Sequence, residues 1–338
     1  MTRMASQYTR RPAILVNPEV AAPRFREVYQ LMRGRTPSEG VATLTDATVF
    51  GGGTIGVHDG RFVAESVYLS VGQSRAVLGA THARSPIGQT FDRAVFAGRY
   101  VQTENYAHFL VEVLPRLLLN RDALPDDAPI LLHESARPRA TTILATAGLD
   151  PARITWIGRE PVRVEALYWP TPNTLHPLHH SPHIFPCLRT IAEQQGCFQP
   201  RRRLFVSRAD ADRRRLLNEH AVFETLAPWG FERVLPGEMP FANQVRMFAE
   251  ARVVVAICGA GLANMVFMPP GGTVVMMSPS SVPGYFFWDV AHHRDIELIA
   301  VWGRNDDAPS PRQHADFWMD VRVLKGAVAQ ALKADCKV

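Results

Sequence analysis

Cysteine, lysine and long hydrophobic runs are scarce in this 338-residue chain. Its four cysteines form no CxxC pair and no disulfide framework, which agrees with a reducing compartment; they are Cys187, Cys197, Cys258 and Cys336. No stretch of about twenty apolar residues exists, so no transmembrane helix is predicted. The start of the chain, MTRMASQYTRR, lacks the apolar core of a signal peptide. We therefore expect a cytoplasmic protein, with contact to a membrane surface left open.

Nearly all the positive charge is arginine. The chain has 37 lysine and arginine residues, of which only three are lysines, and its formal net charge is +5. A basic protein invites a nucleic-acid partner, but the sequence has no basic stripe with interleaved aromatics, no recognition helix and no zinc-finger spacing. Arginine pairs well with phosphate and carboxylate groups. The composition therefore favours small anionic ligands over nucleic acid.

The length, with 46% apolar and 20% charged residues, suits two ordinary globular domains. We expect an N-terminal α/β domain over residues 1–186 and a C-terminal one over 187–338. The first should hold helices at 106–119 and 138–147, and residues 170–186, with five prolines and four histidines, should be an irregular linker or active-site loop. Strands are expected there at 13–16, 49–50, 54–57, 66–71, 93–97, 130–132, 154–157 and 166–169.

The second half alternates between strand-like and helix-like runs, which predicts a doubly wound α/β domain with a parallel sheet. A helix over 187–196 comes first, and a closing helix is expected within 316–333. Between them we expect strands at 204–206 and 231–235, helices at 212–227 and 240–251, and a strand–turn–helix–strand unit over 253–277.

That last unit, Val253–Met277, is the most informative part of the sequence. A short β-branched apolar run leads into Gly259-Ala260-Gly261, then a short helical segment and a second apolar run. Two glycines at a strand-to-helix turn let the backbone approach a ligand, and a helix start offers unpaired N–H groups to an anion. A phosphate site and a turn that needs glycine only for packing both fit this pattern.

Arginines follow the first strand of the same half. Arg208 comes just after Leu204–Val206, at the carboxyl end of a parallel strand, where it should face the ligand crevice. Arg214 is expected on the next helix, one turn before Asn218. For Arg213 and Arg215 a solvated helix face is the better interpretation.

Two motifs are similar to metal sites, and neither is expected to hold a metal. Asp210-Ala211-Asp212 is similar to a DxD motif, but its flanking arginines would compete for both carboxylates, so a helix N-cap is expected. The second motif lacks cysteine partners and a regular helix to space its ligands. It consists of His176, His179, His180 and His183, which we expect to decorate a loop, with contact to an acceptor left open.

A possible general-base pair lies in the helix over 106–119. His108 and Glu112 are four residues apart, which places them on one helix face. A carboxylate beside a histidine orients the ring and stabilises its charged form. An ordinary helix-surface pair has the same spacing, so both interpretations stay open.

Four blocks together resemble glycosyltransferase family 61, the DUF563 group, whose bacterial members act in capsule and exopolysaccharide biosynthesis. They are NYAHFLVEVLPRL (Asn105–Leu117), LFVSRADADRRRLLNE (Leu204–Glu219), the helix with Asn243-Gln244, and GAGLANMVFMPPGGTVV (Gly259–Val275), in the family's order. The resemblance implies a GT-B-like α/β fold, in which two Rossmann-like domains face a central cleft.

The resemblance also implies a metal-independent inverting glycosyltransferase without a cofactor. Such an enzyme moves a sugar from a nucleotide-sugar, here a UDP-sugar, to a hydroxyl of a glycan or lipid-linked glycan acceptor. His108 or Glu112 would be the base, and Arg208 and Arg214 would hold the diphosphate. The donor pocket would be shaped by Asn218, Gln244, Gly259, Ala260, Gly261 and Asn264.

The chain departs from the family pattern at two places. Cys258 stands where many relatives have histidine, and Met276-Met277 stands where many have an acidic residue at the end of the strand. Two other functions therefore stay open: polysaccharide pyruvyl transfer, and non-catalytic nucleotide or glycan binding within a polysaccharide assembly complex. The donor sugar, the acceptor and the oligomeric state are not predicted.

Overall fold

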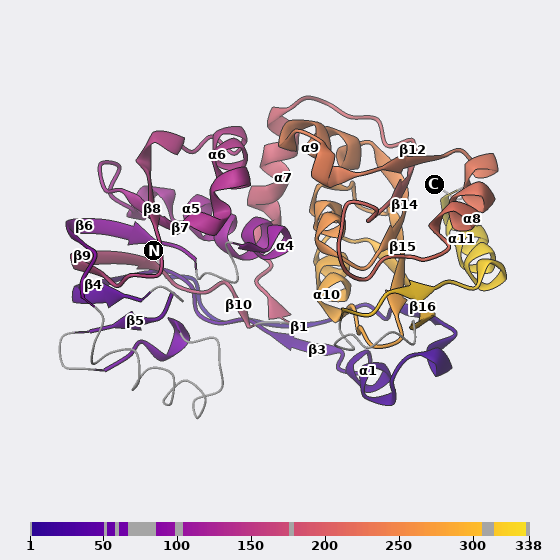
Figure 1. The fold of residues 1–338 in the computed structure, drawn as a ribbon, viewed down its shortest axis with the longest axis horizontal. Coiled ribbons are helices and arrows are strands. Elements are labelled where there is room, and N and C mark those ends of the chain that lie inside the picture. Colours follow the sequence, from indigo (N-terminus) through magenta and orange to yellow (C-terminus); the bar gives the residue numbers. More distant parts are fainter. Residues whose placement is uncertain are drawn as a thin grey trace. The chain divides into compact units, whose positions relative to one another are not determined.

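The computed structural model describes residues 2–50, 53–57, 61–66, 86–98, 104–175, 179–305 and 314–335 (Figure 1). The chain divides into two compact units. The first unit consists of Met1–Ser6 and Thr36–Leu175, and the second unit of Gln7–Arg35 and His176–Val338. Both are mixed α/β, as the sequence predicts.

The first unit contains a six-stranded sheet in the order β5-β4-β9-β6-β7-β8 within the described residues. β4 pairs antiparallel with β5 and β9, whereas β9, β6, β7 and β8 run parallel to one another. The strands are β4 (Val41–Val49), β5 (Ile55–Gly56), β6 (Gln89–Phe96), β7 (Ile130–His133), β8 (Ile154–Ile157) and β9 (Val162–Pro170). Alternating buried residues of β4 and β9, with the ends of β6 and β7, form the core of this unit.

The helix expected over 106–119 is present, but a π-helical turn divides it. It runs as α4 (Tyr106–His108), the π-turn η3 (Phe109–Val113) and α5 (Leu114–Leu119). Pro115 explains the irregularity, because proline has no N–H to donate to the preceding turn. Asn105 starts the helix by accepting a 2.9 Å hydrogen bond from the N–H of Ala107. The remaining helices of this unit are η2 (Ala64–Ser66), η4 (Arg121–Ala123), η5 (Glu134–Ala136), α6 (Arg137–Thr146) and η6 (Pro151–Arg153).

The second unit contains a parallel sheet in the order β13-β12-β14-β15-β16. β2 extends it in parallel beside β16, and β17 joins β16 antiparallel. The strands are β2 (Ile14–Val16), β12 (Arg202–Val206), β13 (Phe231–Val234), β14 (Ala251–Ile257), β15 (Thr273–Pro279), β16 (Glu297–Asn305) and β17 (Phe317–Trp318). The strand order reverses between β12 and β14, and in a doubly wound sheet the ligand crevice lies at this reversal, outside the carboxyl ends of the strands.

Helices cover both faces of this sheet. Figure 1 shows α7, α9 and α10 on one side of the strands and α8 and α11 on the other. The helices of this unit within the described residues are η1 (Pro18–Val20), α1 (Pro23–Val28), α7 (Ile184–Gln194), α8 (Glu219–Leu226), η7 (Ala227–Trp229), η8 (Pro236–Glu238), α9 (Phe241–Ala249), the 3-10 helix η9 (Ala260–Phe267), α10 (Tyr285–His293) and α11 (Val321–Asp335). The β-branched runs of β14, β15 and β16 are buried between the layers, as their continuous apolar sequences predict.

Two local expectations are wrong. Residues 212–218 are not helical: α8 begins at Glu219 with Asn218 as its N-cap residue, so neither Asp210 nor Asp212 caps it. Residues 170–186 are not wholly irregular, because they include the short strands β10 (Thr174–Leu175) and β11 (His179–His180), and α7 begins at Ile184. The strand expected at 66–71 lies outside the described residues from 67 onward, as does His176.

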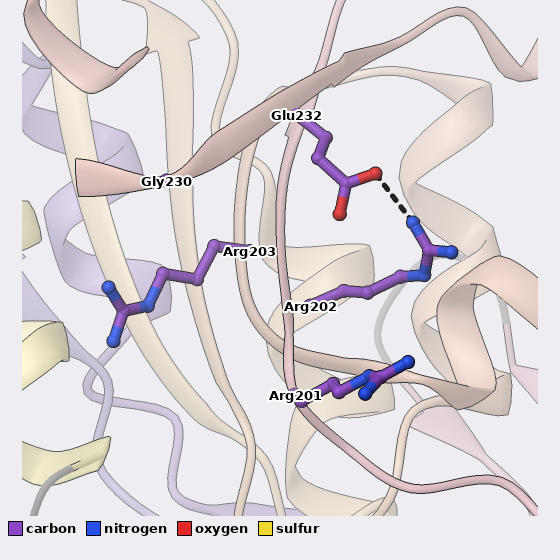
Figure 2. Close-up of a pocket in the computed structure, with 5 residues that line it drawn as sticks. All are labelled: Arg201, Arg202, Arg203, Gly230 and Glu232. Atoms are coloured by element: carbon purple, nitrogen blue, oxygen red, sulfur yellow. Dashed lines mark hydrogen bonds and ion pairs between the residues drawn. The ribbon is translucent and has the colours of Figure 1, made fainter. Parts of the chain in front are cut away.

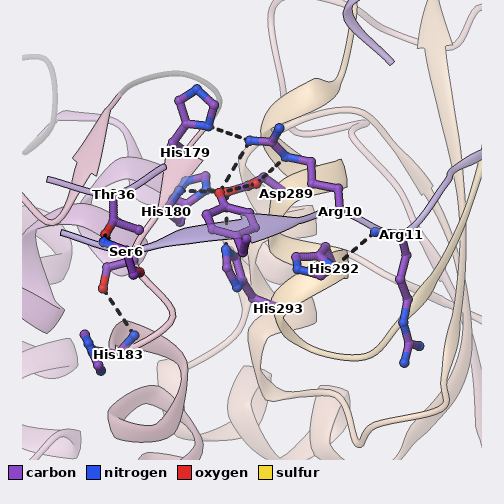
Figure 3. Close-up of polar contacts among 12 residues, drawn as sticks. Ser6, Arg10, Arg11, Thr36, His179, His180, His183, Asp289, His292 and His293 are labelled. Carbon is purple, nitrogen blue, oxygen red and sulfur yellow. Dashed lines mark hydrogen bonds and ion pairs between the residues drawn. The ribbon is translucent and has the colours of Figure 1, made fainter. Parts of the chain in front are cut away.

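The division of the chain differs from a single break after residue 186. Gln7–Arg35 belongs to the second unit because β2 adds to its sheet, and because a buried network holds the preceding residues (Figure 3). In that network Asp289 accepts hydrogen bonds from Tyr8 (2.7 Å) and Arg10 (2.6 Å), while its other oxygen contacts Nδ1 of His180 (2.8 Å). The antiparallel pairing of β1 (Gln7–Thr9) with β3 (Arg33–Arg35) joins the two ends of this segment.

None of the helices in the described residues combines the length and hydrophobicity that a membrane crossing requires. In the same residues, no group of three or more His, Cys, Asp or Glu side chains is arranged to hold a metal ion. His179 and His180, from the histidine-rich segment, contact Arg10 and Asp289 instead.

Candidate functional site

The strand reversal in the second unit brings together two of the sequence motifs. Arg208 follows β12, and the turn Gly259-Ala260-Gly261 follows β14, the neighbouring strand. The side chain of Arg208 lies directly on Gly259: a Cβ built there would overlap Nη1 of Arg208 and lie 2.9 Å from its Cδ. Gly259 has extended backbone (φ −176°), so a side chain is excluded by this close approach and not by backbone conformation.

Arg214 is the second arginine at this place. Arg208 and Arg214 are both half-buried, and each has a buried Nε–H without a hydrogen-bond partner among the described residues. Burial, and then the neighbouring charge of Arg214, lowers the pKa of Arg208 below its ordinary value. Burial also raises the pKa of the Cys258 thiol, against the opposing charges of the two guanidinium groups. A buried donor without an acceptor is costly, so this pair is suited to receive an anion.

Two main-chain N–H groups add to the same place. In the 3-10 helix η9, the first hydrogen bond runs from Leu262 N to Gly259 O (3.0 Å), so the N–H groups of Ala260 and Gly261 precede the hydrogen-bonded turns. The positive end of the helix thus lies beside two guanidinium groups.

A pair of buried amides supports this turn from below. The Asn264 side chain donates to Oε1 of Gln244 (2.9 Å) and to the carbonyl of Gly261 (3.1 Å), and Gln244 donates to the carbonyl of Met239 (3.0 Å). Asn264 is fully buried and Gln244 nearly so. The two amides therefore link α9 to η9 and hold the glycine turn. Because both are buried, they are not exposed to solvent at the surface of the site.

Asn218 is also occupied by the protein itself. Its amide donates to the carbonyl of Met319 (2.8 Å) and accepts from the N–H of Met319 (3.0 Å). At the position expected to be acidic in relatives, Met276 and Met277 are fully buried within β15, which continues to Pro279.

In the first unit, the expected contact between His108 and Glu112 is present. Nδ1 of His108 lies 2.9 Å from Oε1 of Glu112, on the π-turn of the helix. The Glu112 side chain is 1% exposed and that of His108 is 17% exposed, so the carboxylate is buried behind a ring that solvent can reach. π-turns occur often at functional sites. A partly exposed imidazole oriented by a buried carboxylate is an arrangement that can accept a proton from a bound molecule.

A hollow of about 370 Å³ lies at the other end of β12 (Figure 2). Its lining includes Arg201, Arg202 and Arg203. Arg202 is paired there with Glu232 (2.5 Å) and with Glu250 (2.6 Å), and Arg203 donates to the carbonyl of Trp229 (2.9 Å). These partners neutralise or occupy the side chains, and the hollow lies at the amino ends of the strands, away from the crevice side of the sheet.

Residues 106–276, which are half of the chain, match the family described as Glycosyltransferase 61. The chain belongs to the glycosyltransferase 61 family. It is therefore a glycosyltransferase, and the alternative of pyruvyl transfer is not favoured. The His108–Glu112 pair, Arg208, Arg214 and the glycine turn all fall within the matched residues.

Comparison with solved structures finds an E. coli heptosyltransferase, WaaC, with ADP. It is 11% identical, with a TM-score of 0.33, and the match covers 72% of this chain and 99% of the heptosyltransferase. A search of curated proteins finds no match to this family 61 member.

Two neighbours of the arginine pair escaped the sequence analysis. His314 lies beside it, with its carbonyl accepting from Arg214 N (3.2 Å) and its Nε2 3.3 Å from Nη1 of Arg213. Asp316 contacts Arg215. Both lie about a hundred residues further along the chain in a segment without a recognisable motif, so no local signal could have found them.

Proposed function

We propose that this family 61 member is a metal-independent, inverting glycosyltransferase that transfers sugar from a UDP-sugar to a hydroxyl of a bacterial surface glycan. The observation that carries the proposal is the uncompensated arginine pair at the strand reversal, beside the start of η9. Two guanidinium groups and two main-chain N–H groups match the charge and hydrogen-bonding capacity of a diphosphate. They supply the neutralisation that a divalent cation provides in other transferases.

The proposed reaction uses residues of both units. Nε2 of His108 takes the proton of the acceptor hydroxyl, whose oxygen attacks the anomeric carbon from the face opposite the leaving group. The bond between that carbon and the diphosphate oxygen breaks, and UDP leaves with its new charge held by Arg208 and Arg214. A carboxylate can only accept, so Glu112 holds the hydrogen on Nδ1 of His108 and leaves Nε2 as the proton acceptor. We accordingly assign the base to His108 and the orienting role to Glu112.

The proposal retains the finer expectations of the sequence. These are two Rossmann-like domains that face a central cleft, action in capsule or exopolysaccharide synthesis, and a cytoplasmic location with a lipid-linked acceptor at the inner membrane. Within the donor pocket, Gly259, Ala260 and Gly261 would approach the diphosphate. Gln244, Asn264 and Asn218 would act through the backbone they hold.

Donor binding is tested by the melting temperature with and without UDP in the presence of EDTA. UDP should raise it, Arg208→Ala should abolish the rise, and the control Arg201→Ala, which removes an exposed arginine at the amino end of β12, should leave the rise unchanged. Absence of a shift with UDP and with other nucleoside diphosphates would sink the proposal.

Catalysis is tested by replacing the His–Glu pair. His108→Gln should lower kcat by about 100- to 10,000-fold while UDP still binds, because proton transfer is removed and the arginine pair is untouched. Glu112→Gln should lower kcat less, because the ring remains but its orientation and charged form lose support. Equal losses of binding and turnover would instead assign the pair a structural role.

A further inference from the structure

The loop between β12 and α8 holds Arg214 in an unusual backbone conformation. Its φ of 55° lies in the left-handed region, which is unfavourable for a residue with a Cβ. Arg214 is also the residue whose charge acts on both Arg208 and Cys258. Something must therefore keep this loop in place, because its own sequence, which predicts a helix, does not.

The segment His314–Met319 performs that task. It lies alongside the loop through main-chain hydrogen bonds from Leu217 N to Phe317 O (2.9 Å) and from Phe317 N to Arg215 O (3.0 Å). Arg214 itself donates its N–H to the carbonyl of His314 (3.2 Å). At the far end, both groups of the Asn218 amide hold the main chain of Met319. The loop is thus bound to this segment at Arg214 itself and at the residues that follow it.

One side chain stands out in this segment. Asp316 accepts from the main-chain N of Arg215 through Oδ1 (2.8 Å) and from Nε of Arg215 through Oδ2 (2.8 Å). Nη2 of Arg215 lies 2.7 Å from the same Oδ2, and the Asp316 side chain is only 12% exposed, against 58% for Arg215. The carboxylate therefore bonds the residue immediately after Arg214, in both its main chain and its side chain.

We infer that Asp316 is a positioning residue for the donor diphosphate: by bonding Arg215, it fixes the left-handed turn at Arg214 that keeps the Arg214 guanidinium beside Arg208. This inference rests on the proposed function. The sequence predicts a solvated helix face for Arg215, but its main-chain N–H and its guanidinium both bond Asp316 and thereby hold the loop.

The test measures the affinities of UDP, UMP and uridine for the full chain by calorimetry. Asp316→Ala should weaken UDP binding by about 10- to 100-fold, because a misplaced charged group loses most of its contribution. UMP should lose less, and uridine should be unaffected. Asp316→Asn keeps an oxygen that accepts from Arg215 N but loses the negative charge. Its affinity for UDP should therefore lie between those of Asp316→Ala and the unaltered protein. In turnover, the KM for the donor should rise while kcat changes little.

Asp320→Ala is the matched control. Asp320 is a nearby carboxylate that accepts from the N–H groups of Arg322 and Val323 at the start of α11 and has no bond to the Arg214 loop. It should lower the melting temperature slightly and leave the preference for UDP over UMP unchanged. A purely structural role for Asp316 would give the same pattern as this control, with all three ligands affected alike.

Two outcomes separate this inference from the function on which it rests. If the unaltered protein binds UDP no better than uridine, the proposed donor site itself is wrong. If Arg208→Ala removes the preference for UDP but Asp316→Ala and Asp316→Asn retain it in full, only the role of Asp316 is overturned. Should Asp316→Ala fail to fold, the same comparison is decided by Asp316→Asn and Arg215→Ala.

Discussion

Two arginine clusters in the second unit differ in what surrounds them. Arg10 is 1% exposed, pairs with the buried Asp289, and donates to the carbonyls of Leu31 (2.7 Å) and Arg33 (3.2 Å). Arg208 and Arg214 are half-buried, pair with no carboxylate among the described residues, and keep Nε–H groups without acceptors. The carboxylate of Asp289 neutralises Arg10. Arg208 donates to the main-chain carbonyl of Arg213 (3.2 Å), which carries no charge to neutralise it.

The difference indicates how to separate structural from functional charge. Removing one partner of a buried, satisfied ion pair leaves the other charge buried and unpaired, which is costly for folding. Removing a charge that has no partner relieves a cost and takes away only what that charge would have bound. The two clusters should therefore respond in opposite ways to the same kind of substitution.

The largest expected effect is at Arg10. Arg10→Ala should lower the free energy of unfolding by about 3–5 kcal/mol, because Asp289 loses its guanidinium partner inside the protein. Arg11→Ala, at the next residue, breaks an exposed pair with Asp295 and should cost about 1 kcal/mol or less. Urea denaturation measures both. Similar costs for the two variants would contradict the distinction drawn here.

A smaller effect on the free energy of unfolding is expected when the pH is lowered. Burial lowers the pKa of His293 to about 3 and also lowers those of His292 and His179, so all three are neutral in the folded protein near neutrality. Burial alone would raise the pKa of Asp289, but the hydrogen bond from His180 and the nearby positive charges hold it well below its usual range.

The pKa values of the three histidines and of Asp289 are all lowered by folding, so all four groups change stability with pH in the same direction. The unfolded chain takes up protons at these histidines below about pH 6.5 and the folded one does not, so stability present above that pH is lost as the pH falls. His293→Phe keeps the ring that stacks on Phe185 and removes one titrating group. The dependence of unfolding free energy on pH between 6.5 and 4 should be shallower in this variant. An unchanged slope would exclude His293 as a source of it.

The smallest effect on stability is expected at the second cluster. Arg208→Met should leave the free energy of unfolding without nucleotide unchanged within about 0.5 kcal/mol, or raise it, because a buried unpaired donor is replaced by an apolar side chain. Urea titration without and with UDP measures it, and the variant should gain nothing from UDP. A large loss of stability without nucleotide would show that Arg208 is structural, like Arg10.

The candidate site was predictable in part because its strongest signals are local. The glycine turn and Arg208 each follow a strand directly, and the pattern of apolar residues identifies those strands and their parallel order. The spacing of His108 and Glu112 predicts their contact, but only the structure shows that Glu112 is the more deeply buried of the two. Pro115 was visible in the sequence, but its consequence, a π-turn, was not predicted.

The sequence alone determined the α/β class, the family, and the motifs at the ends of β12 and β14, because periodicity and turn chemistry act over a few residues. Tertiary structure alone decided that Arg214 lies outside a helix, that Asp316 bonds Arg215 across 101 residues of chain, and that Arg10 meets Asp289 across 279. Those contacts form only when the sheet brings distant segments together. Whether an arginine is neutralised or left open to a ligand depends on such a partner.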